Sequence, residues 1–121
     1  MKISYAILTH NEGEEIDKLL NFLVVNKRKE DEIVIVDDNS TDDKTIEVLE
    51  KFKSNIVLKS RVFDGDATQK NFLNSHCTGD YILQLDADEL MTEEFIKMLP
   101  EILETNATVD LFYVPRINTV E

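Results

Sequence analysis

The chain has 121 residues, of which 42% are hydrophobic and 31% charged, and these values are typical of one soluble globular domain. Its 25 acidic and 13 basic residues give a formal net charge of −12, and this charge would repel a nucleic-acid backbone or an anionic membrane. The composition therefore argues against nucleic acid as the main partner, and it predicts that a polyanionic ligand binds only where a divalent cation mediates.

Cysteine content and hydropathy indicate where the protein acts. Cys77 is the only cysteine, so the chain forms no intrachain disulfide and no thiolate metal cluster, which favours a reducing compartment. No window approaches the roughly 18 apolar residues of a membrane span, and the apolar run near the N-terminus is shorter than the core of a signal peptide. We therefore expect a cytoplasmic protein, with no membrane span in this chain.

Apolar periodicity predicts strands and helices that alternate along the whole chain. The predicted strands are residues 2–8, 32–38, 55–60, 80–85 and 109–114. The predicted helices are residues 13–27, a segment after NSTDD with Ile46, Leu49 and Phe52 on its apolar face, residues 67–76, and a segment capped by Thr92 that carries Phe95, Leu99, Ile102 and Leu103. Pro100 lies inside this last segment and should break or kink it.

This alternation indicates an α/β fold, in which residues 1–121 form one domain with a mainly parallel central sheet. Right-handed crossovers would place helices on both faces of the sheet and so build three layers. In such sheets ligands bind at the carboxyl ends of the strands, near the point where the strand order reverses. The polar clusters THNE, DDNS and DADE follow the first, second and fourth strands. We therefore expect the three clusters to meet at one edge of the sheet.

Two pairs of aspartates in these clusters are candidates for ligand binding. Asp86 and Asp88 are two positions apart, so on extended chain their carboxylates point the same way and could share one Mg²⁺ with substrate phosphate oxygens. The alternative is a pair of solvated acids that begin the next helix. Asp37 and Asp38 follow another strand, and one of them could accept a hydrogen bond from an imide N–H, such as that of uracil, or from ribose hydroxyls. The alternative use for this pair is a helix cap.

The remaining candidates are residues for which the sequence offers an ordinary structural role as well. Thr9, Asn11 and Glu12 end the first strand, where turn and helix-cap chemistry is the alternative to ligand binding. His10 lies among them and is interpreted as a loop histidine. Lys70, on the third predicted helix, could reach a phosphate or a carboxylate, and an exposed lysine without a role is the alternative.

Taken together, the three clusters resemble the nucleotide-sugar-binding half of the family 2 glycosyltransferases, which have the GT-A fold. The matching segments are ISYAILTHNE, EIVIVDDNSTDDKT and ATQKNFLNSHCTGDYILQLDADE, and the resemblance covers residues 1–115. In this family a basic residue followed by Asn lies nine positions before a Gly that leads into the strand and the Asp-x-Asp motif. Lys70, Asn71, Gly79, Asp86 and Asp88 keep this spacing. QKN followed by LDADE resembles the branch that modifies lipopolysaccharide core and related glycans.

The resemblance implies a transferase that binds a nucleoside-diphosphate sugar, with a UDP-sugar favoured, and passes the sugar with inversion to a hydroxyl of a glycan acceptor. Asp38 would bind the base, Asp86 the ribose, and Asp88 would ligate Mg²⁺ or Mn²⁺ with the help of Asp86. Lys70 stands where the family usually has Arg. The implied donor-binding set is Thr9, Asn11, Glu12, Asp38, Lys70, Asp86 and Asp88.

Family members continue into an acceptor-binding half that supplies the catalytic base. No residue of this chain is assigned as that base, so we expect a fold truncated after the donor-binding half, either a fragment or a natural short form. The main alternative is a receiver-type phosphoacceptor domain of signalling proteins, since IVIVDDNS resembles its opening strand and acidic pair. A receiver would carry this pair nearer the N-terminus than Asp37, and residues 89–121 are too short for its remaining strands.

Overall fold

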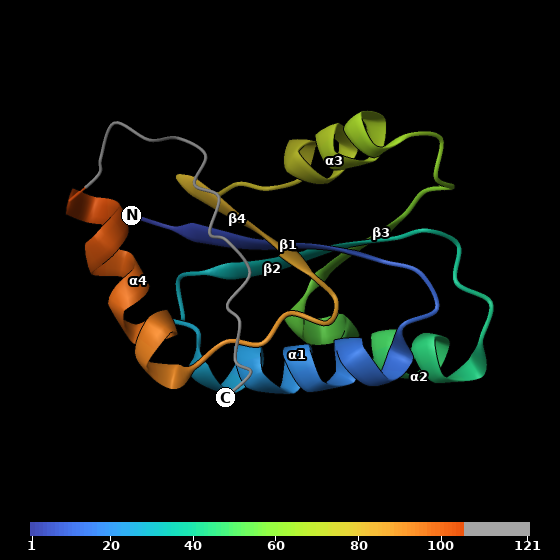
Figure 1. Ribbon diagram of the computed structural model, residues 1–121, viewed down its shortest axis with the longest axis horizontal. Coiled ribbons are helices and arrows are strands. Elements are labelled where there is room, and N and C mark those ends of the chain that lie inside the picture. The colour runs from blue at the N-terminus through green and yellow to red at the C-terminus, as the bar shows by residue number, and fades with distance from the viewer. Residues whose placement is uncertain (106–121) are drawn as a thin grey trace.

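The computed structural model describes residues 1–105, which form a parallel sheet covered by helices on both faces (Figure 1). In chain order the elements are β1 (Ile3–Thr9), α1 (Gly13–Asn26), β2 (Glu32–Asp37), α2 (Asp43–Lys51), the short 3₁₀ helix η1 (Lys53–Asn55), β3 (Val57–Ser60), α3 (Asp66–Ser75), β4 (Tyr81–Asp86) and α4 (Glu93–Thr105). The predicted strand at residues 109–114 lies outside the described residues.

The sheet has the strand order β3-β2-β1-β4, and all its described neighbours pair in parallel. The chain therefore moves outward from β1 to β2 and β3 and then crosses to the other side of β1 to form β4. This reversal is the topological switch point at which α/β sheets bind ligands. The predicted α/β class with a mainly parallel sheet is confirmed.

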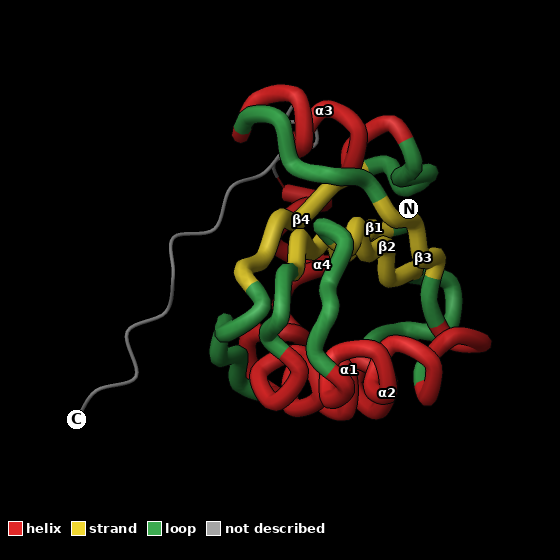
Figure 2. The backbone as a smooth tube through the Cα atoms, turned by 90° about the vertical axis from the view of Figure 1, so that its right-hand side faces the viewer, coloured by secondary structure: helices red, strands yellow, loops and turns green. Residues whose placement is uncertain are grey.

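Two apolar cores lie on opposite faces of the sheet. α3 covers one face, and α1 and α2 lie side by side on the other (Figure 2). Residues of β2 alternate between the two cores: Ile33 and Ile35 pack in the larger one with α1, α2 and α4, whereas Val34 and Val36 pack with Leu73 of α3. The continuous apolar run of this strand thus reflects burial on both faces, as expected for a parallel sheet between two helical layers.

The apolar face of α2 differs from the prediction at one position. Leu49 and Phe52 are buried as expected, but the Ile46 side chain is 51% exposed, and Thr45 and Val48 are buried instead. Positions 45, 48, 49 and 52 have the spacing of one helical face. Ile46 lies next to this face, on the side of the helix that is turned toward solvent. The packing of α2 against α1 therefore selects a slightly rotated face of the helix.

Pro100 does not end α4, which runs from Glu93 to Thr105 with the proline inside it. The predicted break at Pro100 is therefore wrong, and the predicted alternative, a kink, stays a prediction. Proline removes one backbone hydrogen bond from a helix, whereas Ile96, Leu99 and Leu103 of α4 are all buried against the larger core. This packing holds the helix together across the proline. Thr92 accepts a hydrogen bond at its Oγ1 from the backbone N–H of Phe95 (3.0 Å), which confirms the predicted cap.

Candidate functional site

The three polar clusters meet at the carboxyl edge of the sheet. In the register of the parallel strands Thr9 pairs with Asp37, and Leu8 pairs with Asp86. Asp37 pairs in turn with Ser60, the last residue of β3. The ends of all four strands are therefore level, as the alternation of strands and helices predicted.

The two aspartates after β2 have different roles. The Asp37 side chain turns back onto its own loop, where its carboxylate accepts hydrogen bonds from the hydroxyl and from the backbone N–H of Ser40 (3.1 Å for the N–H), and the residue is only 8% exposed. Asp37 thereby fixes the turn that leads to α2, in which Asn39 has a positive φ of 46°. Asp38 is the member of the pair that remains at the surface of the site.

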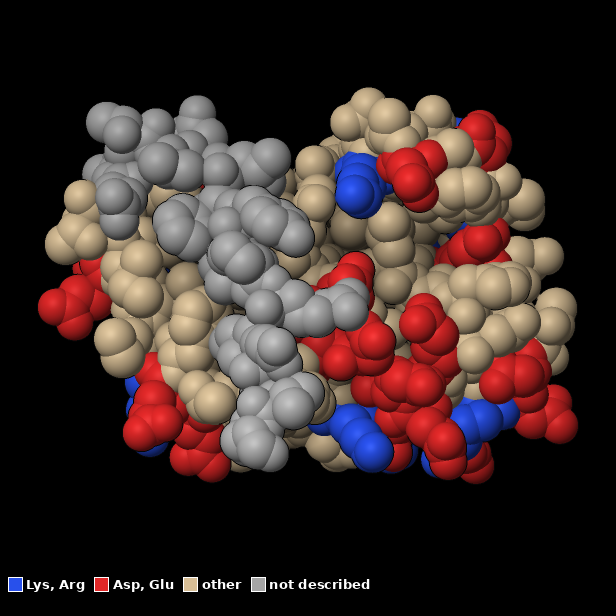
Figure 3. All heavy atoms as spheres, viewed as in Figure 1, with Lys and Arg blue, Asp and Glu red and all other residues tan. Residues whose placement is uncertain are grey.

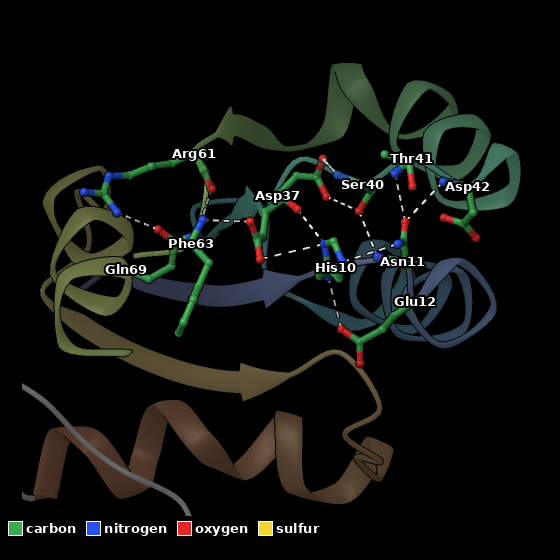
Figure 4. A network of polar contacts seen from close by, with 11 residues as sticks. His10, Asn11, Glu12, Asp37, Ser40, Thr41, Asp42, Arg61, Phe63 and Gln69 are labelled. Carbon is green, nitrogen blue, oxygen red and sulfur yellow. Dashed lines mark hydrogen bonds and ion pairs between the residues drawn. The ribbon is translucent and has the colours of Figure 1, made fainter. Parts of the chain in front are cut away.

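Asn11 joins the loop after β1 to the start of α2 (Figure 4). Its Oδ1 accepts hydrogen bonds from the backbone N–H groups of Thr41 (2.8 Å) and Asp42 (3.1 Å), and its own N–H donates to Ser40 Oγ (2.9 Å). Asp42 is the N-cap residue of α2 but makes no side-chain capping bond. A residue from a distant loop therefore satisfies donors at the helix start that a local cap usually satisfies.

A pocket of about 210 Å³ opens beside these loops. It is lined by Leu8, Thr9, His10, Glu12, Asp38, Phe63, Asp66 and Gln69. Thr9, Glu12 and Asp38 are thus brought together as predicted, at the mouth of β1 and β2. The Thr9 hydroxyl is buried and has no hydrogen-bond partner within the described part of the chain.

Asp38 is held in place on several sides. Its N–H donates to the Thr9 carbonyl oxygen (2.8 Å), its Oδ1 accepts from the backbone N–H of Phe63 (2.8 Å), and its Oδ2 lies 3.8 Å from His10 Nδ1. A carboxylate offers about four acceptor positions, so these contacts leave it able to bind a further donor. The Asp38 side chain is 26% exposed, which keeps it accessible from the pocket.

The segment between β3 and α3, residues 61–65, contributes Phe63 to the lining of the pocket and is fixed by Arg61. The Arg61 guanidinium donates to both carboxylate oxygens of Asp64 (2.8 and 3.1 Å) and to Gln69 Oε1 (2.9 Å), and Gln69 Nε2 donates back to the Arg61 carbonyl oxygen (2.9 Å). The hydrogen bond from Arg61 holds the pKa of Asp64 below its ordinary value. Gln69 is 1% exposed, so this network has a buried anchor.

The Asp-x-Asp segment follows β4 as a turn. The Glu89 N–H donates to the Asp86 carbonyl oxygen (3.0 Å), so the expected extended chain across Asp86 and Asp88 is wrong. Both aspartates are nevertheless exposed, while Ala87 between them is 2% exposed, and the acidic pair faces solvent at the same strand end. Carboxylate oxygens are ligands that a hard cation combines with phosphate and water oxygens.

Lys70 and the acidic pair lie apart from the pocket walls. Lys70 is exposed on α3, and neither it nor Asp86 nor Asp88 lines the pocket. Within residues 1–105, no three side chains of His, Cys, Asp and Glu are grouped as a metal site. No helix in this range has the length and hydropathy needed to cross a membrane.

Comparison with known proteins decides which family the chain represents. The model of glycosyl transferase family 2 matches residues 4–121. The chain belongs to glycosyl transferase family 2. This assignment decides against the receiver domain. An uncharacterised glycosyltransferase of Rickettsia conorii is 38% identical over 93 residues, which are 77% of this chain and 31% of the relative.

Other glycosyltransferases share the fold. The poly(ribitol-phosphate) β-N-acetylglucosaminyltransferase TarS of Staphylococcus aureus is 31% identical over 103 residues, which are 80% of this chain and 18% of TarS. The crystal structure of TarS residues 1–349 in complex with UDP superimposes with a TM-score of 0.71 and 27% identity, over 88% of this chain and 33% of that one. A mannosyltransferase of Pyrobaculum calidifontis, solved with GDP-mannose and Mn²⁺, has a TM-score of 0.69 at 23% identity, over 84% of this chain and 32% of that one, and shares the fold. The chain therefore spans about a third of the length of the Rickettsia relative.

Some residues of the site were not predicted as ligand contacts. His10 lines the pocket although it was interpreted as a loop histidine, and neither Phe63 nor Gln69 was predicted as a ligand contact. Phe63 lies in an irregular loop, where no periodicity marks a side chain as buried or exposed. The sequence signal nearest to Phe63 is Gly65, two residues later. In the structure Gly65 is the N-cap residue of α3 and has a φ of 142°, a conformation that glycine adopts readily.

Proposed function

We propose that this chain binds the donor substrate of a glycosyltransferase, a nucleoside-diphosphate sugar. The base would lie in the pocket beside Asp38, and the diphosphate would lie toward Asp86 and Asp88 with Mg²⁺ or Mn²⁺. The observation that carries the proposal is the arrangement at the switch point, where a pocket with a fixed carboxylate and an exposed carboxylate pair share one edge of the sheet.

Asp38 has the chemistry to recognise a base by its edge. A carboxylate accepts hydrogen bonds and donates none, so it favours a base edge that presents an N–H, as the imide of uracil does. Contacts from Thr9 and Phe63 hold Asp38 in place before any ligand arrives, which lowers the entropy that binding must overcome. The crystal structure of TarS with UDP supports a uridine nucleotide. A UDP-sugar is therefore the preferred donor.

The charge of the site supports the need for a metal ion. Acidic side chains gather over the turn after β4 and the N-terminal end of α1 (Figure 3), and a diphosphate alone would be repelled there. Asp86 and Asp88 supply hard oxygen ligands of the kind that Mg²⁺ and Mn²⁺ prefer. Such an ion, when bound, stabilises the negative charge of the departing nucleoside diphosphate. The two aspartates would orient the diphosphate, and Lys70 on α3 would add a positive charge from the opposite side.

The transfer itself concerns the whole protein. We propose a hydroxyl of a glycan as the acceptor and inversion at the sugar carbon, and we assign no catalytic base to a residue of this chain. In-line attack by an acceptor hydroxyl requires such a base, which typically contributes ~10²- to 10⁴-fold to the rate. The described residues hold donor-binding chemistry, so nucleotide binding is the property to test on this chain.

The test is calorimetric titration of the chain with UDP, CDP, GDP and ADP, each with Mn²⁺ and with a chelator. We expect UDP to bind best, and Mn²⁺ to tighten its binding by about tenfold or more, which corresponds to about 1.4 kcal/mol. Asp88→Asn should remove the effect of Mn²⁺ without unfolding the protein, because Asp88 is exposed at a strand end. Glu47→Gln, an exposed acid on α2, is the matched control and should bind like the wild type. Unchanged Mn²⁺-dependent affinity in Asp88→Asn would refute the metal assignment.

A further inference from the structure

Phe63 is a large aromatic side chain that the fold leaves at the surface of the pocket. It is 48% exposed, lies between β3 and α3, and lines the same pocket as Asp38 and His10. Exposed apolar side chains are common on proteins, but a ring that lines a pocket beside a fixed carboxylate has a specific environment.

The exposure of this ring is not the result of a loosely attached loop. Arg61 N–H donates to the Asp37 carbonyl oxygen (3.0 Å) at the start of the segment, and Phe63 N–H donates to Asp38 Oδ1 (2.8 Å) at its middle. The Arg61 guanidinium then ties the segment to Asp64 and to the buried Gln69. The backbone that carries Phe63 is therefore held from both sides, and the ring is presented in a fixed place.

Phe63 contributes to the pocket with both its backbone and its ring. The Phe63 N–H fixes the carboxylate that would read the edge of a base, while the Phe63 ring provides an apolar surface next to that carboxylate. Figure 4 shows Phe63 between the contacts of Arg61 and Gln69 on one side and His10 on the other. A planar base held at its edge by Asp38 would have a face to cover, and Phe63 is the aromatic side chain of the pocket that can cover it.

We propose that Phe63 is the stacking platform of the nucleobase and that Arg61 is a positioning residue that holds the platform in place. The inference rests on the proposed function, since it assumes that the pocket binds the base of a nucleoside diphosphate. An aromatic face accepts any base, so Phe63 distinguishes nucleotides from ligands without a base, and the choice among bases falls to Asp38.

A tryptophan at position 63 makes stacking directly visible. The chain contains no tryptophan, so Phe63→Trp introduces a single tryptophan, which can be excited selectively, at the proposed contact. Adding UDP with Mn²⁺ should quench and shift its emission, whereas pyrophosphate with Mn²⁺, which has no base, should leave it unchanged. Val25→Trp is the matched control, because Val25 is 79% exposed on α1 and does not line the pocket, and its emission should not respond to UDP.

Affinity measurements give an independent readout. Phe63→Ala keeps the backbone N–H that holds Asp38, so only the ring is lost, and UDP should bind about 5- to 150-fold more weakly, the equivalent of the ~1–3 kcal/mol of one base–aromatic stack. Phe63→Tyr should stay within about threefold of the wild type because it retains the ring. Pyrophosphate with Mn²⁺ should bind equally to all three. Arg61→Met should weaken UDP and, combined with Phe63→Ala, should add little further loss, because the two residues act through the same ring.

The outcomes separate the two proposals. Wild-type binding of UDP combined with a silent Phe63→Trp emission and an unaltered Phe63→Ala affinity would overturn the role of Phe63 and leave the proposed function standing. Failure of the wild type to bind any nucleoside diphosphate would overturn both. Circular dichroism shows whether each variant is folded. If Phe63→Ala does not fold, the fluorescence response of Phe63→Trp to UDP still tests the role of Phe63.

Discussion

Asn11 gives the sharpest structural prediction, because one side chain holds two helix-start donors while its backbone is in the left-handed region. Replacing it with alanine removes the acceptor of the Thr41 and Asp42 N–H groups, which lie 2.8 and 3.1 Å from Oδ1. Each bond contributes about 0.5–1.5 kcal/mol net. Alanine at the Asn11 φ of 52° adds about 1–2 kcal/mol of strain. The two lost hydrogen bonds and the strain together span a range of destabilisation. Because water can satisfy the released N–H groups, which are near solvent, we expect the lower part of this range, a loss of about 2–3 kcal/mol in unfolding free energy.

A series at this position separates the two contributions. Asn11→Asp keeps an oxygen that can accept both hydrogen bonds at the helix N-terminus, where a negative charge is favourable, and should be close to the wild type. Asn11→Gly loses the two hydrogen bonds, but glycine adopts the positive φ at this position without strain. Its unfolding free energy should therefore fall by about 1–2 kcal/mol less than that of the alanine variant. Urea unfolding followed by circular dichroism measures each free energy. An alanine variant as stable as the wild type, or a glycine variant no better than alanine, would refute the reasoning.

Two further predictions concern the ends of the sheet opposite and next to the site. Burial raises the pKa of the Glu32 carboxyl, but hydrogen bonds from Ser4 and Thr78 and the charge of Lys2 outweigh it and hold the pKa below its ordinary value of 4.5. The ionised Glu32 carboxylate therefore stabilises the folded protein at neutral pH, and this stabilisation is lost as the pH falls below about 4.5. In urea unfolding the wild type should be more stable than Glu32→Gln at pH 7, and the difference in unfolding free energy should shrink on acidification. A difference that does not change with pH would contradict this. Gly13→Ala places a Cβ 2.7 Å from the backbone nitrogen of Thr45 in α2 and should cost about 1–3 kcal/mol of unfolding free energy in the same assay, whereas a neutral result would show that α1 and α2 can separate freely.

The sequence predicts most of the fold because its strongest patterns are local. The run EIVIVD contains β-branched residues at positions that face both cores, so its burial on two faces follows from composition alone. The meeting of the three polar clusters follows from geometry, since parallel strands end at the same edge of a sheet. The roles of Asp38 and of the Asp86 and Asp88 pair in ligand binding remain predictions, which the structure makes testable by placing them at that edge.

The features that were wrong or missed depend on contacts between distant parts of the chain. The exposed position of Ile46 depends on how α2 is rotated against α1. A rotation by one residue hardly changes how well the apolar pattern of the sequence fits a helix, so the sequence does not reveal it. The continuity of α4 through Pro100 depends on the core that buries Leu99 and Leu103. The capping of α2 by Asn11 joins residues about thirty positions apart, which no local motif records.

At the pocket, two proposed ligand contacts, Asp38 and Phe63, each lie beside a residue that fixes the local backbone. Asp37 uses its carboxylate to close the turn, and this leaves Asp38, the next residue, to face the pocket. Arg61 ties its segment to the buried Gln69, and two residues later Phe63 presents its ring. Groups held in this way lose little freedom when a ligand binds, so a site with few contacts gains affinity from its rigidity. The acidic pair after β4 is exposed at the same edge of the sheet, where we propose that a cation and a diphosphate bind.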